Sequence, residues 1–393
     1  MPLLPVAEAQ ARVLALGTPL AIEHVALAEA AHRYAAADIR ARRTQPASDL
    51  SAMDGYAIRH ADLGRPLRLI GESAAGRPFT GAVGAGESVR IFTGATMPAG
   101  ADCVLVQEEA RAEGDIIHLS GEGPAHPGRN VRRRGLDFAD GDVLIPAGAA
   151  ITPARLAVAA IGGHATLPVH ARVRVAIAAT GDELVPAGQS LDAGQLPESN
   201  GVMLAAMLAP LGVDILDLGI LPDRADALEA AFRAVDADVL VTTGGASVGD
   251  HDLVRPALEA AGATIDFWRI ALRPGKPMMA GRLGRAVVMG LPGNPVSAFV
   301  TAELFVKPLV RHLAGAADPS PPTLTAKLGE DLPANGERTD YLRAELRDGA
   351  AFASTIQDSS MLRTLARSTC LIVRPPHATA ARFGDSAEIL MIA

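Results

Sequence analysis

The stretch RVRVAIAATGDE at residues 172–183 decides the fold, together with ADVLVTTGG at residues 237–245. Each is a Val-rich apolar run that ends in glycine and polar residues, which is typical of strands buried on both faces of a parallel sheet. Similar runs occur at 213–218, 264–270 and 286–289. They are separated by stretches of helical periodicity at 200–211, 223–235, 250–261 and 295–313. This alternation predicts a doubly wound α/β domain over residues 172–317.

The chain before this domain changes texture twice. Residues 5 to about 43 show Ala, Leu and Val at roughly helical spacing, and Thr152-Pro153 opens a second helical run that ends at Gly162-Gly163. Between them lie short β runs punctuated by glycines. We therefore predict a discontinuous helical segment, residues 1–44 and 141–171, interrupted by an inserted β-rich domain at residues 45–140.

The chain after the α/β domain begins with a proline-rich linker at 319–322. Short β runs follow at 341–346, 370–373 and 387–392, which predict a small β domain over residues 318–393. The fold class is accordingly multidomain α/β.

Composition excludes several classes of protein. The net charge of −8 disfavours nucleic acid as the main partner. The two cysteines, Cys103 and Cys370, can build neither a disulfide framework nor a zinc site, and Cys103 lies in an apolar run that favours core packing. No apolar stretch approaches about 18 residues, so we expect no membrane span. No signal peptide is evident either, and we expect a cytoplasmic protein.

Polar loops follow four of the predicted strands. They are Thr180–Glu183, Thr242–Asp252, Arg273–Lys276 and Leu291–Ser297. Because ligands of open α/β sheets bind outside the carboxyl ends of the strands, these loops should converge on one site. Their glycine amides, helix N-termini and cations suit an anion such as phosphate. Their carboxylates suit Mg²⁺ beside it.

Two nucleotide-binding motifs are absent, and one hydrolase motif is present. No GxGxxG follows a strand and no GxxxxGK[ST] occurs, so neither a dinucleotide fold nor a P-loop is supported. Gly245-Ala-Ser247-Val-Gly249 matches the GxSxG nucleophile elbow, which keeps a serine hydrolase as an alternative. That alternative lacks an evident acid–histidine pair, and Ser247 is more simply a helix N-cap or a phosphate ligand. The run Arg132–Arg134 is a solvated turn or an anion clamp.

Six motifs in order resemble one family. They are Ser-Ala-Met-Asp54-Gly-Tyr-Ala, Ile91-Phe-Thr93-Gly-Ala, Arg134-Gly-Leu-Asp137, Thr180-Gly-Asp-Glu183-Leu, Gly244-Gly-Ala-Ser-Val-Gly and Leu291-Pro-Gly-Asn-Pro-Val-Ser297. Together they resemble the signature set of the molybdopterin molybdenumtransferases, the family that includes the C-terminal domain of gephyrin. The resemblance covers essentially the whole chain.

The resemblance implies a fold and a reaction. It implies a homodimer of subunits with a helical segment, an inserted β domain, a molybdopterin-binding α/β domain and a C-terminal β barrel. The active cleft would lie between the α/β domain of one subunit and the inserted domain of the other. The reaction would use molybdopterin-AMP, molybdate and Mg²⁺, and would release AMP. The molybdopterin adenylyltransferase and other proteins of the cofactor pathway are the implied partners.

The resemblance also implies roles for individual residues. Catalysis would involve Asp54, Thr93, Asp137, Glu183 and Asp252, with Glu183 and Asp252 as Mg²⁺ ligands. Substrate binding would involve Thr180, Gly181, Asp182, Gly244, Gly245, Ser247, Arg273, Lys276, Pro292, Gly293, Asn294, Pro295 and Ser297. The chain departs from the family pattern at Arg273, where lysine is usual, and at Asp250, where glutamate is common. Asp358-Ser-Ser360-Met361 also lacks an expected preceding glycine.

Three other functions remain open. A binding protein could keep the pterin pocket without catalysis, although the carboxylates at Asp54, Asp137, Glu183 and Asp252 bring an anion no benefit in binding alone. A molybdopterin adenylyltransferase would share the α/β domain but would not need the other domains. Tungstate, a near-isostere of molybdate, could be the metal oxyanion that is inserted.

Overall fold

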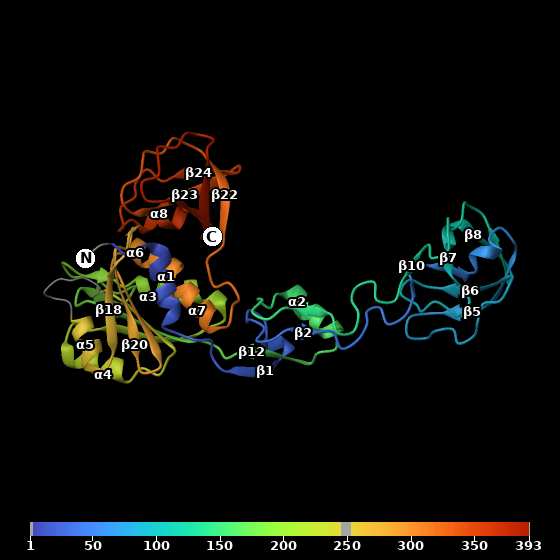
Figure 1. Cartoon of the computed structure of the whole chain (residues 1–393), viewed down its shortest axis with the longest axis horizontal. Coiled ribbons are helices and arrows are strands. Elements are labelled where there is room, and N and C mark those ends of the chain that lie inside the picture. The colour runs from blue at the N-terminus through green and yellow to red at the C-terminus, as the bar shows by residue number, and fades with distance from the viewer. Residues whose placement is uncertain (1–2, 245–252, 393) are drawn as a thin grey trace. The chain divides into compact units, whose positions relative to one another are not determined.

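The computed structural model describes residues 3–244 and 253–392. The chain divides into two compact units (Figure 1). Unit 1 comprises Met1–Ala37, Ala147–Ile151 and Pro168–Ala393, and unit 2 comprises Asp38–Pro146 and Thr152–Leu167. Unit 1 therefore holds both the α/β domain and the C-terminal β domain, while the finer boundaries given above remain predictions.

A six-stranded sheet forms the centre of the α/β domain. The predicted strands are confirmed as β13 (Arg174–Thr180), β16 (Asp214–Leu221), β17 (Val239–Thr243), β18 (Thr264–Arg269) and β21 (Ala286–Leu291). The strand order is β16-β13-β17-β21-β20-β18. Strands β16, β13, β17 and β21 are parallel neighbours. Their carboxyl ends therefore share one edge.

The sixth strand, β20 (Pro277–Leu283), corrects the expectation of an all-parallel sheet. It runs antiparallel to both β18 and β21, so β18 still points the same way as the parallel strands. The pattern missed β20 because its sequence, PMMAGRL, lacks the Val-rich texture of the other strands and contains Gly281. The loop between β18 and β20 nevertheless starts at the expected edge.

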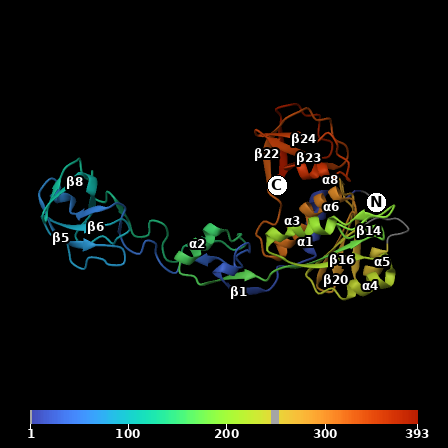
Figure 2. The same cartoon turned by 180° about the vertical axis from the view of Figure 1, so that it is seen from behind.

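Helices cover both faces of this sheet, as a doubly wound domain requires. Alternate residues of β13 enter different cores: Val175 and Ile177 join one cluster, and Ala176 joins the other. The first cluster receives α1 (Val6–Ala15), α3 (Asn200–Leu208), α6 (Pro295–Thr301), the π-helical turn Ala302–Val306 and α7 (Lys307–Leu313). The second receives α4 (Ala225–Arg233) and α5 (Val254–Ala260). Figure 2 shows α1 and α3 on the side of the sheet away from α4 and α5.

The N-terminal segment is not the long helix that its composition predicted. Helix α1 ends at Ala15, and Gly17-Thr-Pro19 follows, where proline cannot continue a helix. The chain then forms β1 (Ile22–Ala26), which pairs with β12 (Thr166–His170), and the 3₁₀ turn Leu27–Glu29. The Ala-rich stretch after it is extended, since Ala35 N–H donates to Ala149 O at 3.1 Å. Tertiary pairing here overrides the helical propensity of alanine.

The C-terminal β domain is a closed barrel, as predicted. Its strands are β19 (Leu272–Arg273), β22 (Thr323–Leu328), β23 (Thr339–Arg347), β24 (Ala350–Ala353), β25 (Cys370–Arg374) and β26 (Ser386–Met391). They follow the order β19-β23-β24-β22-β26-β25, and an additional β23–β25 pairing closes the barrel. One helix, α8 (Leu362–Arg367), lies in the connection between β24 and β25. Strand β19 is contributed by the α/β domain and ties it to the barrel.

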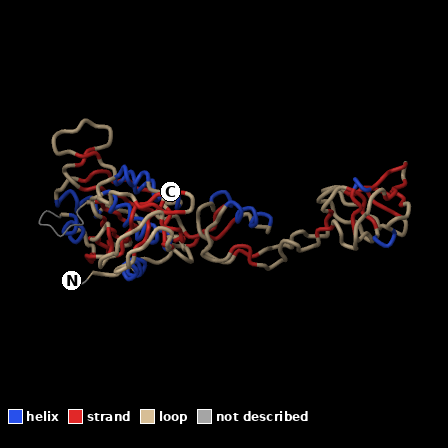
Figure 3. The backbone as a smooth tube through the Cα atoms, turned by 90° about the horizontal axis from the view of Figure 1, so that it is seen from above, coloured by secondary structure: helices blue, strands red, loops and turns tan. Residues whose placement is uncertain are grey.

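Unit 2 contains the inserted β domain, whose strands and loops appear in Figure 3. Six strands pair in the order β7-β4-β6-β5-β9-β8. They are β4 (Gly55–Ile58), β5 (Leu67–Ser73), β6 (Glu87–Ile91), β7 (Cys103–Val106), β8 (Ala110–Glu113) and β9 (Ile116–Leu119). Shorter elements are β2 (Ile39–Arg40), β3 (Leu50–Ser51), β10 (Val131–Arg132), β11 (Val143–Ile145) and the 3₁₀ turns His60–Asp62 and Gln107–Glu109.

Two smaller expectations about unit 2 are also confirmed. Helix α2 (Pro153–Ile161) starts where predicted, with the Thr152 hydroxyl accepting a hydrogen bond from Arg155 N–H at 3.3 Å. Cys103 is buried in the sheet core, as its apolar neighbours indicated. Across the residues that the structure describes, no helix has the length and apolarity needed to cross a membrane.

Candidate functional site

The strand order of the α/β domain reverses between β13 and β17. Strand β13 leads through α3 to β16 on one side, and the chain then returns through α4 to β17 on the other side. Ligands of doubly wound sheets bind at such a point. A cleft of about 610 Å³ lies there, lined by Thr180, Glu183, Leu184, Leu196, Pro197, Glu198, Ser199, Asn200, Thr243, Gly244, Gly293, Asn294, Pro295 and Ser360.

Glycine is required where the β13 and β17 loops meet. Gly244 has φ +87°, and a Cβ there would lie 2.5 Å from Thr180 O. The Thr180 hydroxyl donates to Thr243 O at 3.3 Å and joins the two strand ends. No side chain therefore covers the backbone at Gly244, and an anionic ligand can approach its amide closely.

The loop after β21 forms a second wall. Helix α6 begins at Pro295 with Asn294 as its N-cap. Asn200, at the start of α3, donates from Nδ2 to Gly293 O at 2.8 Å. Two helix N-termini thus lie beside the cleft. Pro292 and Ser297, also predicted for this site, are buried and do not line the cleft.

The barrel contributes to the same cleft. Ser359 O accepts a hydrogen bond from Val296 N–H in the first turn of α6, at 3.1 Å. This contact brings the neighbouring Ser360 to the cleft wall. The departure from the family pattern before Ser360 therefore falls on a segment that reaches the site.

Carboxylates gather beside the end of β13. Asp182 accepts a hydrogen bond from Asp223 N–H at 3.0 Å, and Glu183 lines the cleft. Burial, together with the nearby Asp182 and Glu183 carboxylates, raises the pKa of Asp223 above its ordinary value. Carboxylates grouped in this way attract a cation.

These carboxylates fit Mg²⁺ better than a metal that needs a complete protein cage. The described part of the chain holds no group of three or more His, Cys, Asp or Glu side chains arranged around a metal position. Mg²⁺ commonly binds to one or two carboxylates, with waters and substrate phosphates completing its shell. Glu183 can supply one such ligand, whereas the other predicted ligand, Asp252, lies outside the described residues.

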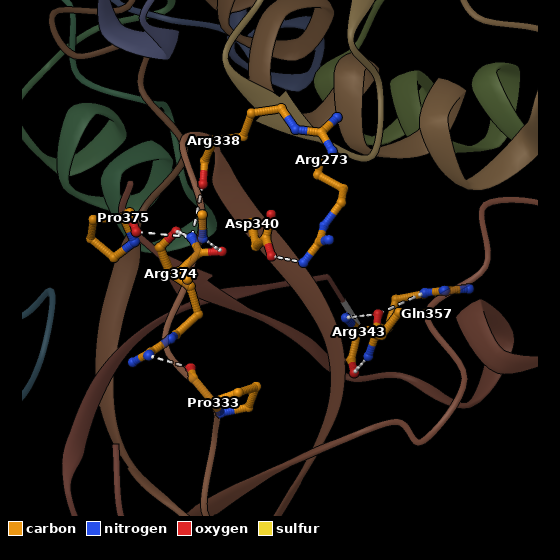
Figure 4. Close-up of polar contacts among 10 residues, drawn as sticks. Arg273, Pro333, Arg338, Asp340, Arg343, Gln357, Arg374 and Pro375 are labelled. Atoms are coloured by element: carbon orange, nitrogen blue, oxygen red, sulfur yellow. Dashed lines mark hydrogen bonds and ion pairs between the residues drawn. The ribbon is translucent and has the colours of Figure 1, made fainter. Parts of the chain in front are cut away.

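The predicted cations lie at a different cavity. Arg273 and Lys276 line a cavity of about 340 Å³ together with Leu3, Asn335, Gly336, Glu337, Arg338 and Asp340. The Arg273 guanidinium forms an ion pair with the buried Asp340 of β23 (Figure 4). Neither cation lines the 610 Å³ cleft. This loop therefore lines a second cavity, while its Gly275 lies against α6, where an added Cβ would be 3.6 Å from Ser297 O. The convergence of all four loops on one site stays a prediction.

In unit 2, Asp54 and Thr93 form a hydrogen-bonded pair. Asp54 Oδ1 accepts from Thr93 N–H at 2.7 Å and from the Thr93 hydroxyl at 2.8 Å. The Thr93 backbone hydrogen bond, then its hydroxyl and to a smaller extent the charge of Arg90, lower the pKa of Asp54. Gly55 must follow Asp54, because a Cβ there would lie 2.1 Å from Leu105 O. The pair joins positions 39 residues apart.

Asp137 is exposed and lies on a separate segment of unit 2. Its N–H donates to Gln45 O at 3.0 Å, and no hydrogen bond connects it to Asp54 or Thr93 within the described chain. In the nearby arginine run, Arg133 pairs with Asp49 at 2.6 Å and Arg134 N–H donates to the same carboxylate at 2.8 Å. Asp49 therefore anchors this loop.

Sequence reasoning missed one part of the cleft and named another that the structure does not describe. The missed residues are Leu184, Leu196, Pro197, Glu198, Ser199, Asn200, Thr243 and Ser360. The Ser-Asn pair before the predicted helix at 200 was a signal for a helix N-terminus at the site. Gly245, Ser247, Asp250 and Asp252 lie outside the described residues, as does the GxSxG motif.

Three protein-family descriptions match the chain. "MoeA N-terminal region (domain I and II)" matches residues 4–163, "Probable molybdopterin binding domain" matches residues 176–312, and "MoeA C-terminal region (domain IV)" matches residues 325–392. The matches are consecutive and cover nearly the whole chain.

Curated relatives and solved structures agree with these matches. A molybdopterin molybdenumtransferase of Haemophilus influenzae is 38% identical over 365 residues, covering 90% of each chain. One from Staphylococcus aureus is 31% identical over 404 residues, covering 99% of this chain and 95% of the relative. The crystal structure of a molybdopterin biosynthesis MoeA protein from Pyrococcus horikoshii OT3 is 27% identical, with a TM-score of 0.84 over 100% of both chains.

Proposed function

Because this chain belongs to the molybdopterin molybdenumtransferase family, we propose that it inserts molybdate into adenylylated molybdopterin in a Mg²⁺-dependent reaction that releases AMP. The chain is a transferase of molybdenum cofactor biosynthesis. The observation that carries the proposal is the cleft at the sheet's switch point, where bare glycine backbone, helix N-termini and Glu183 surround one space.

The adenylylated pterin binds in that cleft. Its pyrophosphate lies against the backbone at Gly244 and Gly293, where no side chain obstructs close approach. Thr180 and Asn294 contribute polar side chains to the same walls. The cleft volume of about 610 Å³ is within the range usual for small-molecule sites.

Glu183 and, from the family resemblance, Asp252 would hold Mg²⁺. Bound Mg²⁺ neutralises phosphate charge and thereby eases departure of AMP. Glu183 follows β13, which ends at Thr180 and pairs with β17, the strand that precedes Gly244. Asp182 and Asp223 add negative field that attracts the cation to this side of the cleft.

Molybdate is recognised at the cavity that contains Lys276. Arg273 and Arg338 line the same cavity, and the Arg273–Asp340 ion pair fixes the orientation of one guanidinium. With Arg273 held by Asp340, Lys276 supplies the charge for the oxyanion. Arginine at position 273, where lysine is usual in the family, thus provides a positive charge and also an ion pair with the barrel.

The protein acts as a cytoplasmic homodimer with two composite clefts. Each cleft combines Glu183 and Asp252 of one subunit with Asp54, Thr93 and Asp137 of its partner. The Asp54–Thr93 pair supports this arrangement, because it presents a carboxylate from an open sheet and lines neither cavity described above. A molybdopterin adenylyltransferase would supply the substrate.

The decisive experiment is incubation of the protein with molybdopterin-AMP, Mg²⁺ and molybdate while AMP is measured. Molybdate-dependent AMP release, together with molybdenum bound to the dithiolene, is the expected result. Binding of molybdopterin-AMP without release would identify a pterin-binding scaffold instead. A parallel reaction with tungstate measures which oxyanion is preferred.

A further inference from the structure

Arg90 lies next to the Asp54–Thr93 pair and contacts two aromatic rings. Its guanidinium carbon is 5.2 Å from the ring centre of Tyr56 and 4.9 Å from that of Phe92. Both distances are within the range of cation–π attraction.

The Arg90 guanidinium also fixes the main chain beside Asp54. Arg90 Nη1 donates to Gly55 O at 3.1 Å, and Nη2 donates to Gln107 Oε1 at 2.7 Å. The backbone N–H of Gln107 in turn donates to Asp54 O at 3.1 Å. Arg90 therefore holds the Gly55 carbonyl directly and the Asp54 carbonyl through Gln107.

The electrostatic situation of Arg90 differs from that of a nearby arginine on β5. Arg68 forms an ion pair with Glu87 at 2.7 Å, so its charge is neutralised locally. The described residues offer Arg90 no carboxylate at ion-pair distance, since its hydrogen bonds go to a carbonyl and an amide. Its charge instead acts on the carboxylate of Asp54.

We propose that Arg90 is the positioning residue of Asp54, holding its main chain so that one carboxylate oxygen stays on Thr93 and the other stays available to substrate. This inference rests on the proposed role of Asp54 in the reaction. Oδ1 receives both hydrogen bonds from Thr93, and no group in the described chain donates to Oδ2. A displacement of a reacting group by about 1 Å can cost ~10²-fold in rate, so the restraint matters for turnover.

The test compares Arg90→Ala, Arg90→Lys and wild type in the full-length protein, with AMP release as the readout. Arg90→Ala should lower kcat at least ~10-fold and change the KM for molybdopterin-AMP less than ~3-fold, because the restraint acts on a catalytic group rather than on binding. Arg90→Lys keeps the charge but loses the planar fork and the stacking, so its kcat should lie between the two.

Arg68→Ala is the matched control. It removes an arginine from the adjacent strand of the same sheet, and that arginine contacts Glu87 rather than the Asp54 segment. Its kinetics should equal those of wild type. Thermal unfolding of every variant shows whether the domain is intact. If Arg90→Ala does not fold, the Arg90→Lys and Arg90→Gln variants carry the test.

A double variant separates positioning from a general structural effect. If Arg90 acts only through Asp54, Arg90→Ala should lower the residual activity of Asp54→Asn by less than ~2-fold. A further loss of ~10-fold in that background would overturn the inference, as would wild-type kcat in Arg90→Ala. If Asp54→Asn itself turns over like wild type, the proposed role of Asp54 fails. If instead Asp54→Asn is inactive while Arg90→Ala is fully active, the role of Asp54 stands and only the positioning role of Arg90 fails.

Discussion

The cleft of the α/β domain and the Asp54–Thr93 pair of unit 2 present acidic groups in contrasting ways. In the cleft, Glu183 is one member of a concave wall that strand ends, helix N-termini and a barrel loop build together. Asp54 instead sits before a strand of an open sheet, held by Thr93 and flanked by Arg90. The first site is a concave cleft with residues from several elements in its walls. The second provides an oriented carboxylate from a sheet of unit 2, which under the proposed shared cleft would act with the α/β domain of the partner subunit.

The difference also appears in how charge is balanced. Near the cleft, burial and then the charges of Asp182 and Glu183 raise the pKa of Asp223, so ionisation of this carboxyl is disfavoured unless a cation lies nearby. At Asp54 the hydrogen bonds of Thr93 lower the pKa and stabilise the ionised form. The two regions should therefore respond differently to metal removal and to pH.

Removal of divalent metal should have the largest effect. We expect EDTA to abolish molybdate-dependent AMP release and Mg²⁺ to restore it, because the carboxylates at the end of β13 repel an anionic substrate unless a cation lies between them. The pKa of Asp54 should not change when EDTA is added. Full turnover in EDTA would show that the cleft carboxylates serve another purpose.

Glu183→Gln should come next, with AMP release falling at least ~10²-fold while fold and dimer are retained. The substitution keeps the size of the side chain and removes the charge of an exposed residue, so stability should change little. The matched control is Glu198→Gln, which alters another acidic residue of the same wall. A smaller loss there would assign the effect to Glu183 specifically. Wild-type turnover in Glu183→Gln would remove that residue from the mechanism.

Mixed dimers test whether the two regions cooperate across subunits. Homodimers of Asp54→Ala or of Glu183→Ala have two damaged clefts and should be inactive. In a heterodimer one cleft collects both substitutions and the other collects neither, so random mixing should restore roughly a quarter of wild-type activity. Subunits are exchanged by co-expression, and heterodimers are verified with two affinity tags. Verified heterodimers that remain inactive would contradict the shared cleft.

The parallel core strands could be predicted from sequence because their signal is local. Val-rich runs such as 174–180 report burial on both faces, and the alternation with helices sets the fold class. The same reasoning failed at residues 16–43, where alanine is compatible with helix, strand and extended chain, and neighbouring strands decide among them. Strand β20 was missed because its methionines and glycine carry no periodic signal.

The candidate site shows the same division between local and long-range information. Glycine-rich loops at strand ends predicted the cleft, and Glu183, Gly244 and Gly293 do line it. The partner of Arg273, Asp340, lies 67 residues away on a barrel strand, and local sequence contains no sign of that ion pair. The Asp54–Thr93 hydrogen bond likewise depends on the pairing of β4 with β6. Contacts between side chains that are distant in the sequence depend on tertiary pairing, and the local sequence does not specify them.

The smallest expected effect is a titration shift that isolates the Asp54 region from the cleft. Thr93→Val removes the hydroxyl donor but keeps the backbone N–H, which is the larger cause of the lowered pKa. The pKa of Asp54 should therefore rise toward about 3.9, the ordinary value, without reaching it. Since the folded pKa is depressed, the contribution of Asp54 to stability is present above about pH 3.9 and is lost as pH falls through the folded pKa. In Thr93→Val that acid-side decline in unfolding free energy should be shallower.

Carbon-13 titration of labelled aspartate carboxyls, with Asp54→Asn to assign the signal, measures the shift. Thr96→Val is the control, because it lies three residues further along and donates no hydrogen bond to Asp54. An Asp54 pKa that Thr93→Val leaves unchanged would mean that the hydroxyl contributes nothing, and that the backbone of unit 2 alone holds this carboxylate ionised.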